Sequence, residues 1–285
     1  MTLPLRRVAA AGLALVLSAL LAACFVLPGK FAATLDLRKD GRFAFTYQGE
    51  VWVMGLSKLS EMGAAAGKFE PSTCYSDDGN MTEHECTKDE LAAQRASWET
   101  EQQASAEKRK KDAEEMKALL GGIDPSDPKA GEELAARLRR QAGWKSVTYK
   151  GEGLYDVDFA IAGRIDHDFN FPTIERMAMT TPFVALSRRN DNTVRIETPG
   201  FAMGGGSNPM AAMGGLAAMG AADQDGGKGP KLPKIEGKFT VTTDGTILAN
   251  NTDEGPQADT TGQRLTWTVD ARNPAAPTAL IRLGN

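Results

Sequence analysis

Histidine and cysteine are both scarce in this chain, whose 285 residues include two histidines and three cysteines. His84-Glu85 is not followed by the second histidine, four residues on, that completes a zinc-protease helix. No G-x-S-x-G nucleophile elbow occurs, and no dinucleotide fingerprint follows a predicted strand. Residues 63–69 have three spacers where a phosphate-binding loop needs four, and Phe69 replaces its Ser or Thr. We therefore expect neither a cofactor nor a metal.

Positive charge is also in short supply. The 33 basic residues are outnumbered by 37 acidic ones, which gives a formal net charge of −4. An acidic chain is repelled by nucleic acid and by an anionic membrane face. We therefore expect no nucleic-acid partner, and any attachment to a membrane must have another source.

The N-terminus supplies such a source. Arg6 and Arg7 precede an apolar run over residues 8–22, and the run closes on Leu21-Ala22-Ala23-Cys24. Its length of about fifteen residues suits a signal peptide and falls short of the roughly 20 residues of a membrane span. The pattern resembles the lipobox of bacterial lipoproteins.

That resemblance implies an address and an attachment. Residues 1–23 would be removed as a signal peptide, and Cys24 would take a lipid and become the new N-terminus. Two or three acyl chains hold a protein stably on a membrane, whereas one holds it only marginally. Because Phe25 is not Asp, the Gram-negative pattern implies an outer-membrane lipoprotein facing the periplasm, provided that the source has an outer membrane.

Lipidation of Cys24 leaves Cys74 and Cys86 as an even pair. In an oxidising compartment they can form a disulfide, whose loop of about a dozen residues would contribute up to about 3 kcal/mol. The alternative is two unrelated thiols.

Alternating apolar and polar residues predict several strands joined by turns. Residues 34–38 and 43–47 flank Asp40-Gly41 as a first hairpin, which continues to Val53 past Gly49, where an interior glycine predicts a bulge or bend. Two further hairpins are predicted at 183–188 with 193–198 and at 238–243 with 246–249, and two last strands at 264–270 and 278–283.

The cleanest alternation runs from Leu154 to Pro172, with apolar residues at odd positions and polar ones at even positions. The run is longer than the usual strand, so we expect a bend at Gly163 and two strands. His167 shares its parity with the apolar residues, and we expect it to point with them.

Two helices interrupt the strands. Thr87-Lys88-Asp89-Glu90 forms a capping box, and the helix it begins should end at Gly121-Gly122. Residues 99–115 carry no apolar stripe, so this helix should project into solvent with only its ends packed. A second helix is predicted from Asp127-Pro128 to before Gly143. The helical hairpin 87–143 is either a partner-binding arm or a layer that covers one face of a sheet.

Residues 201–233 are rich in Gly, Ala and Met and predict a flexible loop. The piece beyond it is too short to be a stable domain alone, so we expect one composite domain over residues 24–285. The predicted fold class is α+β, with a mostly antiparallel sheet built from hairpins, an inserted αα-hairpin and this loop.

Three candidate sites remain to be weighed. Asp156 and Asp158 share a strand face about 7 Å apart, which suits general acid and base work but is also common on surface strands. His167 lies between two aspartates, yet strand parity places them on the opposite face. The methionines of the loop could bind Cu(I), or simply make it apolar; they are Met203, Met210, Met213 and Met219.

These features favour a non-enzymatic, lipid-anchored binding or assembly module at the membrane surface, with an envelope protein as partner. The segments 243–252, 265–269 and 279–283 resemble LppM-type lipoprotein domains, which implies a β-rich domain with no assigned chemistry. The alternatives are a periplasmic hydrolase that uses Asp156, Asp158 or His167, and a carrier of an apolar ligand.

Overall fold

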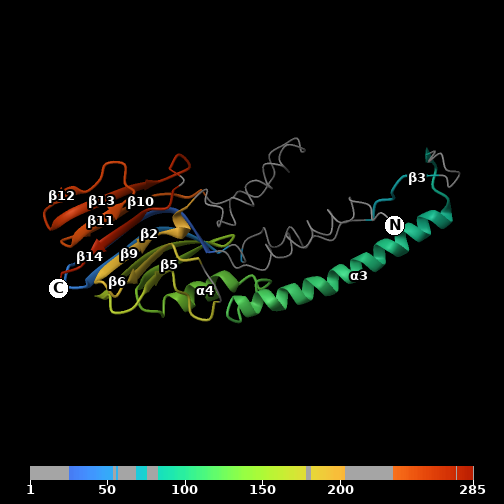
Figure 1. Ribbon diagram of the computed structural model, residues 1–285. Coiled ribbons are helices and arrows are strands. Elements are labelled where there is room, and N and C mark those ends of the chain that lie inside the picture. The colour runs from blue at the N-terminus through green and yellow to red at the C-terminus, as the bar shows by residue number, and fades with distance from the viewer. Residues whose placement is uncertain are drawn as a thin grey trace.

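The computed structural model describes residues 26–53, 56, 69–75, 83–177, 181–202, 234–273 and 275–284. Over these residues the chain folds as two packed β-sheets with a long helix that leads away from them (Figure 1). The α+β class and the mostly antiparallel pairing are confirmed. Cys24, the four methionines and nearly all of the loop at 201–233 lie outside the described residues.

The larger sheet has seven strands in the order β12-β13-β10-β1-β2-β6-β5. Its strands are β1 (Val26–Leu37), β2 (Arg42–Val53), β5 (Trp144–Gly151), β6 (Leu154–Arg164), β10 (Glu236–Thr243), β12 (Gln257–Asp259) and β13 (Gly262–Val269). The predicted first hairpin is β1 with β2, and Gly41 in its turn has a φ of 83°.

The glycine within that hairpin has the predicted role. The β1–β2 register shifts between Pro28 and Phe31, opposite Gly49, whose φ is 139°. A Cβ atom at Gly49 would lie 2.1 Å from the carbonyl oxygen of Lys30. Only glycine fits this bulge.

The smaller sheet has five strands in the order β11-β14-β9-β8-β7. Its strands are β7 (Phe169–Phe171), β8 (Val184–Arg188), β9 (Thr193–Glu197), β11 (Thr246–Asn250) and β14 (Thr278–Arg282). The predicted hairpin of 183–188 with 193–198 is present as β8 with β9.

The hairpin predicted around Asp244-Gly245 is wrong. Both strands exist, but β10 belongs to the larger sheet and β11 to the smaller one, where it pairs with β14. β10 lies between β1, to which it is parallel, and β13. The turn therefore carries the chain from one sheet to the other, and segments on both sides of residues 203–233 build the same two sheets.

The core lies between the sheets and is dominated by aromatic side chains. Phe45 and Tyr47 of β2 contact Phe171 of β7, with ring centroids 5.2 and 5.0 Å apart. Phe201, at the end of the 3-10 helix Pro199–Phe201, is fully buried and stacks on Phe31 at 4.2 Å. The flexible loop thus cannot begin at Phe201, because that residue joins the two layers.

The long alternating segment splits into two strands as predicted. β6 ends just past Gly163, and β7 begins five residues after Arg164 in the other sheet. The prediction for His167 is wrong: it is exposed. The chain bends between Ile165 and Phe169, so strand parity does not extend across those residues.

The second predicted helix is α4 (Ala130–Leu138), which packs against β5 with Leu134 and Leu138 buried. It begins later than predicted, because Asp127 closes a turn by accepting a hydrogen bond from the amide of Lys129 at 2.8 Å. The hydroxyl of Tyr155 donates to the carbonyl of Gly131 at 3.1 Å and fixes α4 to the sheet.

Candidate interaction arm

The long helix α3 (Lys88–Leu119) has 32 residues and is therefore about 48 Å long. The predicted capping box is present at its start. Thr87 Oγ1 accepts from the amide of Glu90 at 3.3 Å, and Glu90 Oε2 accepts from the amide of Thr87 at 2.8 Å. At its end Gly121 and Gly122 have φ values of 65° and 93°, and both predicted helix limits are confirmed.

Only the C-terminal end of α3 is anchored in the core. Leu120 and Ile123, just beyond it, are fully buried, and Met116 and Leu119 pack against the same cluster. Arg137 of α4 donates to the carbonyl of Gly121 at 2.8 Å. The rest of α3 extends away from the sheets (Figure 1).

The two helices consequently have different roles. α4 lies against β5, beyond the C-terminal end of α3, and the helices do not run side by side (Figure 1). The two predicted alternatives for the pair were a partner-binding arm and a layer that covers one face of a sheet. α4 packs on the sheet, whereas α3 projects from it as expected for its middle, and partner binding by α3 stays a prediction. We call residues 69–75 and 83–120 the arm.

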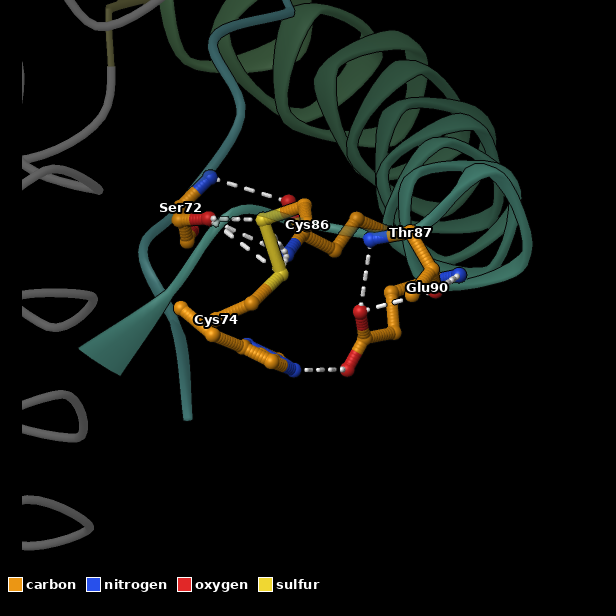
Figure 2. Close-up of a disulfide and its surroundings, with 7 residues drawn as sticks. Ser72, Cys74, Cys86, Thr87 and Glu90 are labelled. Carbon is orange, nitrogen blue, oxygen red and sulfur yellow. Dashed lines mark hydrogen bonds and ion pairs between the residues drawn. A yellow bond between two sulfur atoms is a disulfide. The ribbon is translucent and has the colours of Figure 1, made fainter. Parts of the chain in front are cut away.

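The tip of the arm is closed by the predicted disulfide between Cys74 and Cys86, which is confirmed. Two short strands pair at this tip, β3 (Cys74–Tyr75) and β4 (Glu83–His84). The disulfide joins Cys74 in β3 to Cys86, two residues after β4, and the Cα atoms of the two cysteines are 5.2 Å apart. Because Cys86 directly precedes Thr87, the disulfide fastens β3 to the N-cap of α3 (Figure 2).

Non-covalent contacts extend this closure along the first turns of α3. The Gln94 side chain forms two hydrogen bonds with the backbone of Ser72. Its Oε1 accepts from the Ser72 amide at 2.9 Å, and its Nε2 donates to the Ser72 carbonyl at 3.1 Å. Phe69 contacts Trp98 edge-on at 5.8 Å, and the guanidinium of Arg95 lies 5.4 Å from the Phe69 ring. Residues 69–75 therefore follow the helix as a fixed second segment.

Electrostatics also favours the cap. The hydrogen bond from the Thr87 amide is the main cause that lowers the pKa of Glu90 below its ordinary value. His84 adds to this effect, since its Nε2 lies 3.4 Å from Glu90 Oε1. Figure 2 shows Thr87 and Glu90 beside the disulfide.

Charge is unevenly distributed on the exposed surface of α3. Glu99 and Glu101 are exposed in the half nearer the tip, and Lys108, Lys110 and Lys111 are exposed in the half nearer the sheets. Among the described side chains from 99 to 112, none is buried. The arm thus presents an acidic pair and, further toward the sheets, a basic cluster to solvent, the latter flanked by the exposed Glu107, Glu114 and Glu115.

The candidate catalytic residues do not meet. Asp156 is exposed and Asp158 half-buried near the start of β6, on the face turned away from the core, whereas His167 lies beyond the other end of that strand. The aspartates beside His167 both engage Arg188: Asp166 Oδ1 is 3.6 Å from its Nη1, and Asp168 Oδ1 accepts from its amide at 3.3 Å.

Metal ligands do not gather either. Within the described ranges, the side chains of His, Cys, Asp and Glu form no group of three or more that could hold a metal ion. The role of Gln94 could not be predicted from the sequence. A single glutamine in a charged helix gives no sign that its side chain binds the backbone of Ser72, 22 residues upstream.

Across the described part of the chain, no helix is both long and apolar enough to span a membrane. No family model, curated protein or solved structure matches the sequence or the fold. The resemblance of the C-terminal strands to LppM-type domains therefore stays a prediction.

Proposed function

We propose that this protein is a lipid-anchored lipoprotein of the cell envelope that acts as a non-enzymatic binding or assembly module, with its arm as the surface that binds an envelope protein. The observation that supports this role is a helix of about 48 Å that leaves the core and ends in a tip fixed by a disulfide.

The construction of the tip fits a binding role better than a structural one. An isolated helix has only marginal stability in water, and most helices gain their stability from packing an apolar face. α3 has no such face in its middle, yet the disulfide, the capping box and the Gln94 contacts hold its far end. A binding element that is rigid beforehand loses less entropy when its partner docks.

The charges of the arm indicate the chemistry of that partner. Its surface should carry basic groups opposite Glu99 and Glu101 and acidic groups opposite Lys108, Lys110 and Lys111. Exposed ion pairs of this kind are screened by salt, because the Debye length is about 8 Å at physiological ionic strength. Association should therefore weaken as salt is added.

The proposed anchor is the lipidated Cys24, followed by the folded body almost at once. β1 begins at Val26, two residues after the cysteine of the lipobox. The sandwich would then stand close to the membrane that holds the lipid, which we propose to be the outer membrane on its periplasmic side, in a source that has one.

In-cell photo-crosslinking tests the arm. A photo-reactive residue at Glu101 should capture a protein that the same residue at Thr268, on an exposed sheet position, does not. The double substitution Lys108→Glu/Lys111→Glu should abolish that capture, while Lys145→Glu on β5 should leave it intact. Equal capture from both sites, or capture that survives the double substitution, would count against the arm.

A separate measurement tests the anchor. Cys24→Ser should leave the protein unprocessed or release it from the membrane fraction. Unchanged processing and fractionation would refute lipidation without bearing on the arm.

A further inference from the structure

The outer side of the seven-stranded sheet has an ordered arrangement that the proposed function does not use. Inward-facing residues of its strands are buried, whereas the alternate residues are exposed or half-buried. The pairing register places them in rows across the strands, and the central row holds Thr46, Thr34, Thr240 and Thr266 side by side.

One end of this face, the arginine rim, consists of Arg38, Arg42 and Arg164. The amide of Arg38 donates to the carbonyl of Arg42 at 2.8 Å, which closes the β1–β2 hairpin. Arg42 and Arg164 are direct register partners of β2 and β6. Like charges directly opposite each other destabilise a strand pair, and here Asp40 offsets part of the repulsion.

The three arginines differ in how far they are neutralised. Arg38 is held by Asp36 at 2.5 Å and donates to the Thr261 carbonyl at 2.8 Å. Arg42 forms an exposed ion pair with Asp40 at 2.7 Å. The Arg164 side chain forms no hydrogen bond and no close ion pair among the described residues, but it interacts with Asp40 at longer range: the pKa of Asp40 is lowered mainly by the hydrogen bond from the Arg42 amide and also by the charge of Arg164.

Beneath the guanidinium groups lies a hollow. It has a volume of about 600 Å³, and it is lined by the three arginines together with Phe43, Ala44, Ala162, Gly163 and one carboxylate, Asp36, which is paired with Arg38. Ala44, Ala162 and Gly163 have at most a methyl side chain, so the space between the arginines is open to solvent. It is large enough for a phosphate group and part of the molecule that bears it.

We propose that the arginine rim binds the phosphate group of an anionic ligand. A guanidinium presents parallel N–H donors in a planar fork that matches phosphate oxygens, and several such forks can share one tetrahedral anion. An anion between Arg42 and Arg164 would add its attraction to both arginines to the one that Asp40 already supplies. The cluster also stands out because the chain as a whole is acidic.

Two sources could carry this phosphate group: a soluble phosphate ester or a lipid headgroup. The rim lies at the opposite end of β1 from Val26, and twelve strand residues span roughly 40 Å. A sheet anchored close to Val26 would hold the rim away from its own membrane. The geometry therefore favours a soluble ligand or a more distant surface.

The test uses the full chain in neutral detergent, with inorganic phosphate as the probe against chloride at matched ionic strength. Arg164→Gln removes the arginine without a close ion pair, and Arg272→Gln, at an arginine 91% exposed, is the charge-matched control. In chloride, Arg164→Gln should unfold close to the wild-type temperature, since it removes both a like-charge contact with Arg42 and an attraction to Asp40. In phosphate, the wild type and Arg272→Gln should be stabilised, and Arg164→Gln should bind phosphate roughly 10-fold more weakly.

A parallel assay distinguishes the sources. Vesicles of phosphatidylcholine with and without phosphatidylglycerol should show no difference between the two variants if the ligand is soluble. A difference seen only with phosphatidylglycerol would support the rim and assign it to headgroups. If neither phosphate nor vesicles separates Arg164→Gln from Arg272→Gln, the proposal is overturned, whatever the outcome for the arm.

Discussion

Replacing Cys74 and Cys86 by serine removes the covalent closure of the tip and should loosen the arm without loosening the sandwich. The two cysteines are 12 residues apart in the sequence. Closing a loop of that size stabilises the closed form by about 3 kcal/mol in the chain-entropy description. Because the sheets lie at the far end of α3, this stabilisation should be confined to the tip.

Hydrogen exchange measures that local effect. A loss of about 3 kcal/mol should speed exchange on the order of 100-fold for amides that open with the tip, namely those of 69–75 and of the first turns of α3. Amides of β1 and β2 should exchange as in the wild type. The Gln94 side chain still contacts Ser72 in the variant and limits the increase.

Two results would refute this reasoning. Unchanged exchange at 69–75 would show that the non-covalent contacts hold the tip alone. A global unfolding free energy that falls by the same 3 kcal/mol would show that arm and sandwich unfold as one unit. The serine substitutions remove the disulfide without a reductant. They also leave the proposed lipidation site, Cys24, unchanged.

Other predictions concern single residues. Thr87→Ala should destabilise the start of α3 by about 1 kcal/mol, seen as faster exchange in its first turn. Because the folded pKa of Glu90 is lowered, its contribution is present above its ordinary pKa of 4.5 and is lost as the pH falls through the folded value. The protection factors of that turn, which correct for the slower intrinsic exchange in acid, should therefore fall less with pH in Thr87→Ala than in the wild type. Gly49→Ala should cost on the order of 3 kcal/mol in urea unfolding, and Gly122→Ala, with open space around its Cβ position, only about 1 kcal/mol. Phe201→Ala should cost about 3–5 kcal/mol in the same assay and would cost almost nothing if this residue belonged to a flexible loop.

Local signals predicted the local structure well. The capping box and the glycine pair marked both limits of α3, because each supplies hydrogen-bond partners to the free groups at a helix end. The disulfide followed from counting cysteines, and the bulge at Gly49 from a glycine inside an alternating run. All of these depend on residues close together in the sequence.

The pairing of distant strands could not be predicted in this way. Asp244-Gly245 marks a turn, but the same residues serve a hairpin and a crossing between sheets, and only the positions of β1 and β14 decide which forms. β5 was missed because its buried Trp144 and Val147 lie three residues apart, where a register shift breaks the two-residue period.

The candidate sites show the same division. Parity correctly placed Asp156 and Asp158 on one face, but it failed for His167 once the chain had left β6. The arginine rim joins Arg38 and Arg42, at the turn between β1 and β2, to Arg164 of β6, which lies more than 120 residues further along the sequence, and no motif connects them.

The parallel pairing of β1 with β10 has a consequence for how the chain folds. β1 emerges first during synthesis, yet the strand that completes its pairing follows about 200 residues later. Until then β1 and β2 form a hairpin with an open edge that can accept a strand from another molecule. Contacts between such distant segments slow folding, because a long loop must close before they form. Aggregation should therefore compete with folding most strongly in chains truncated before residue 236.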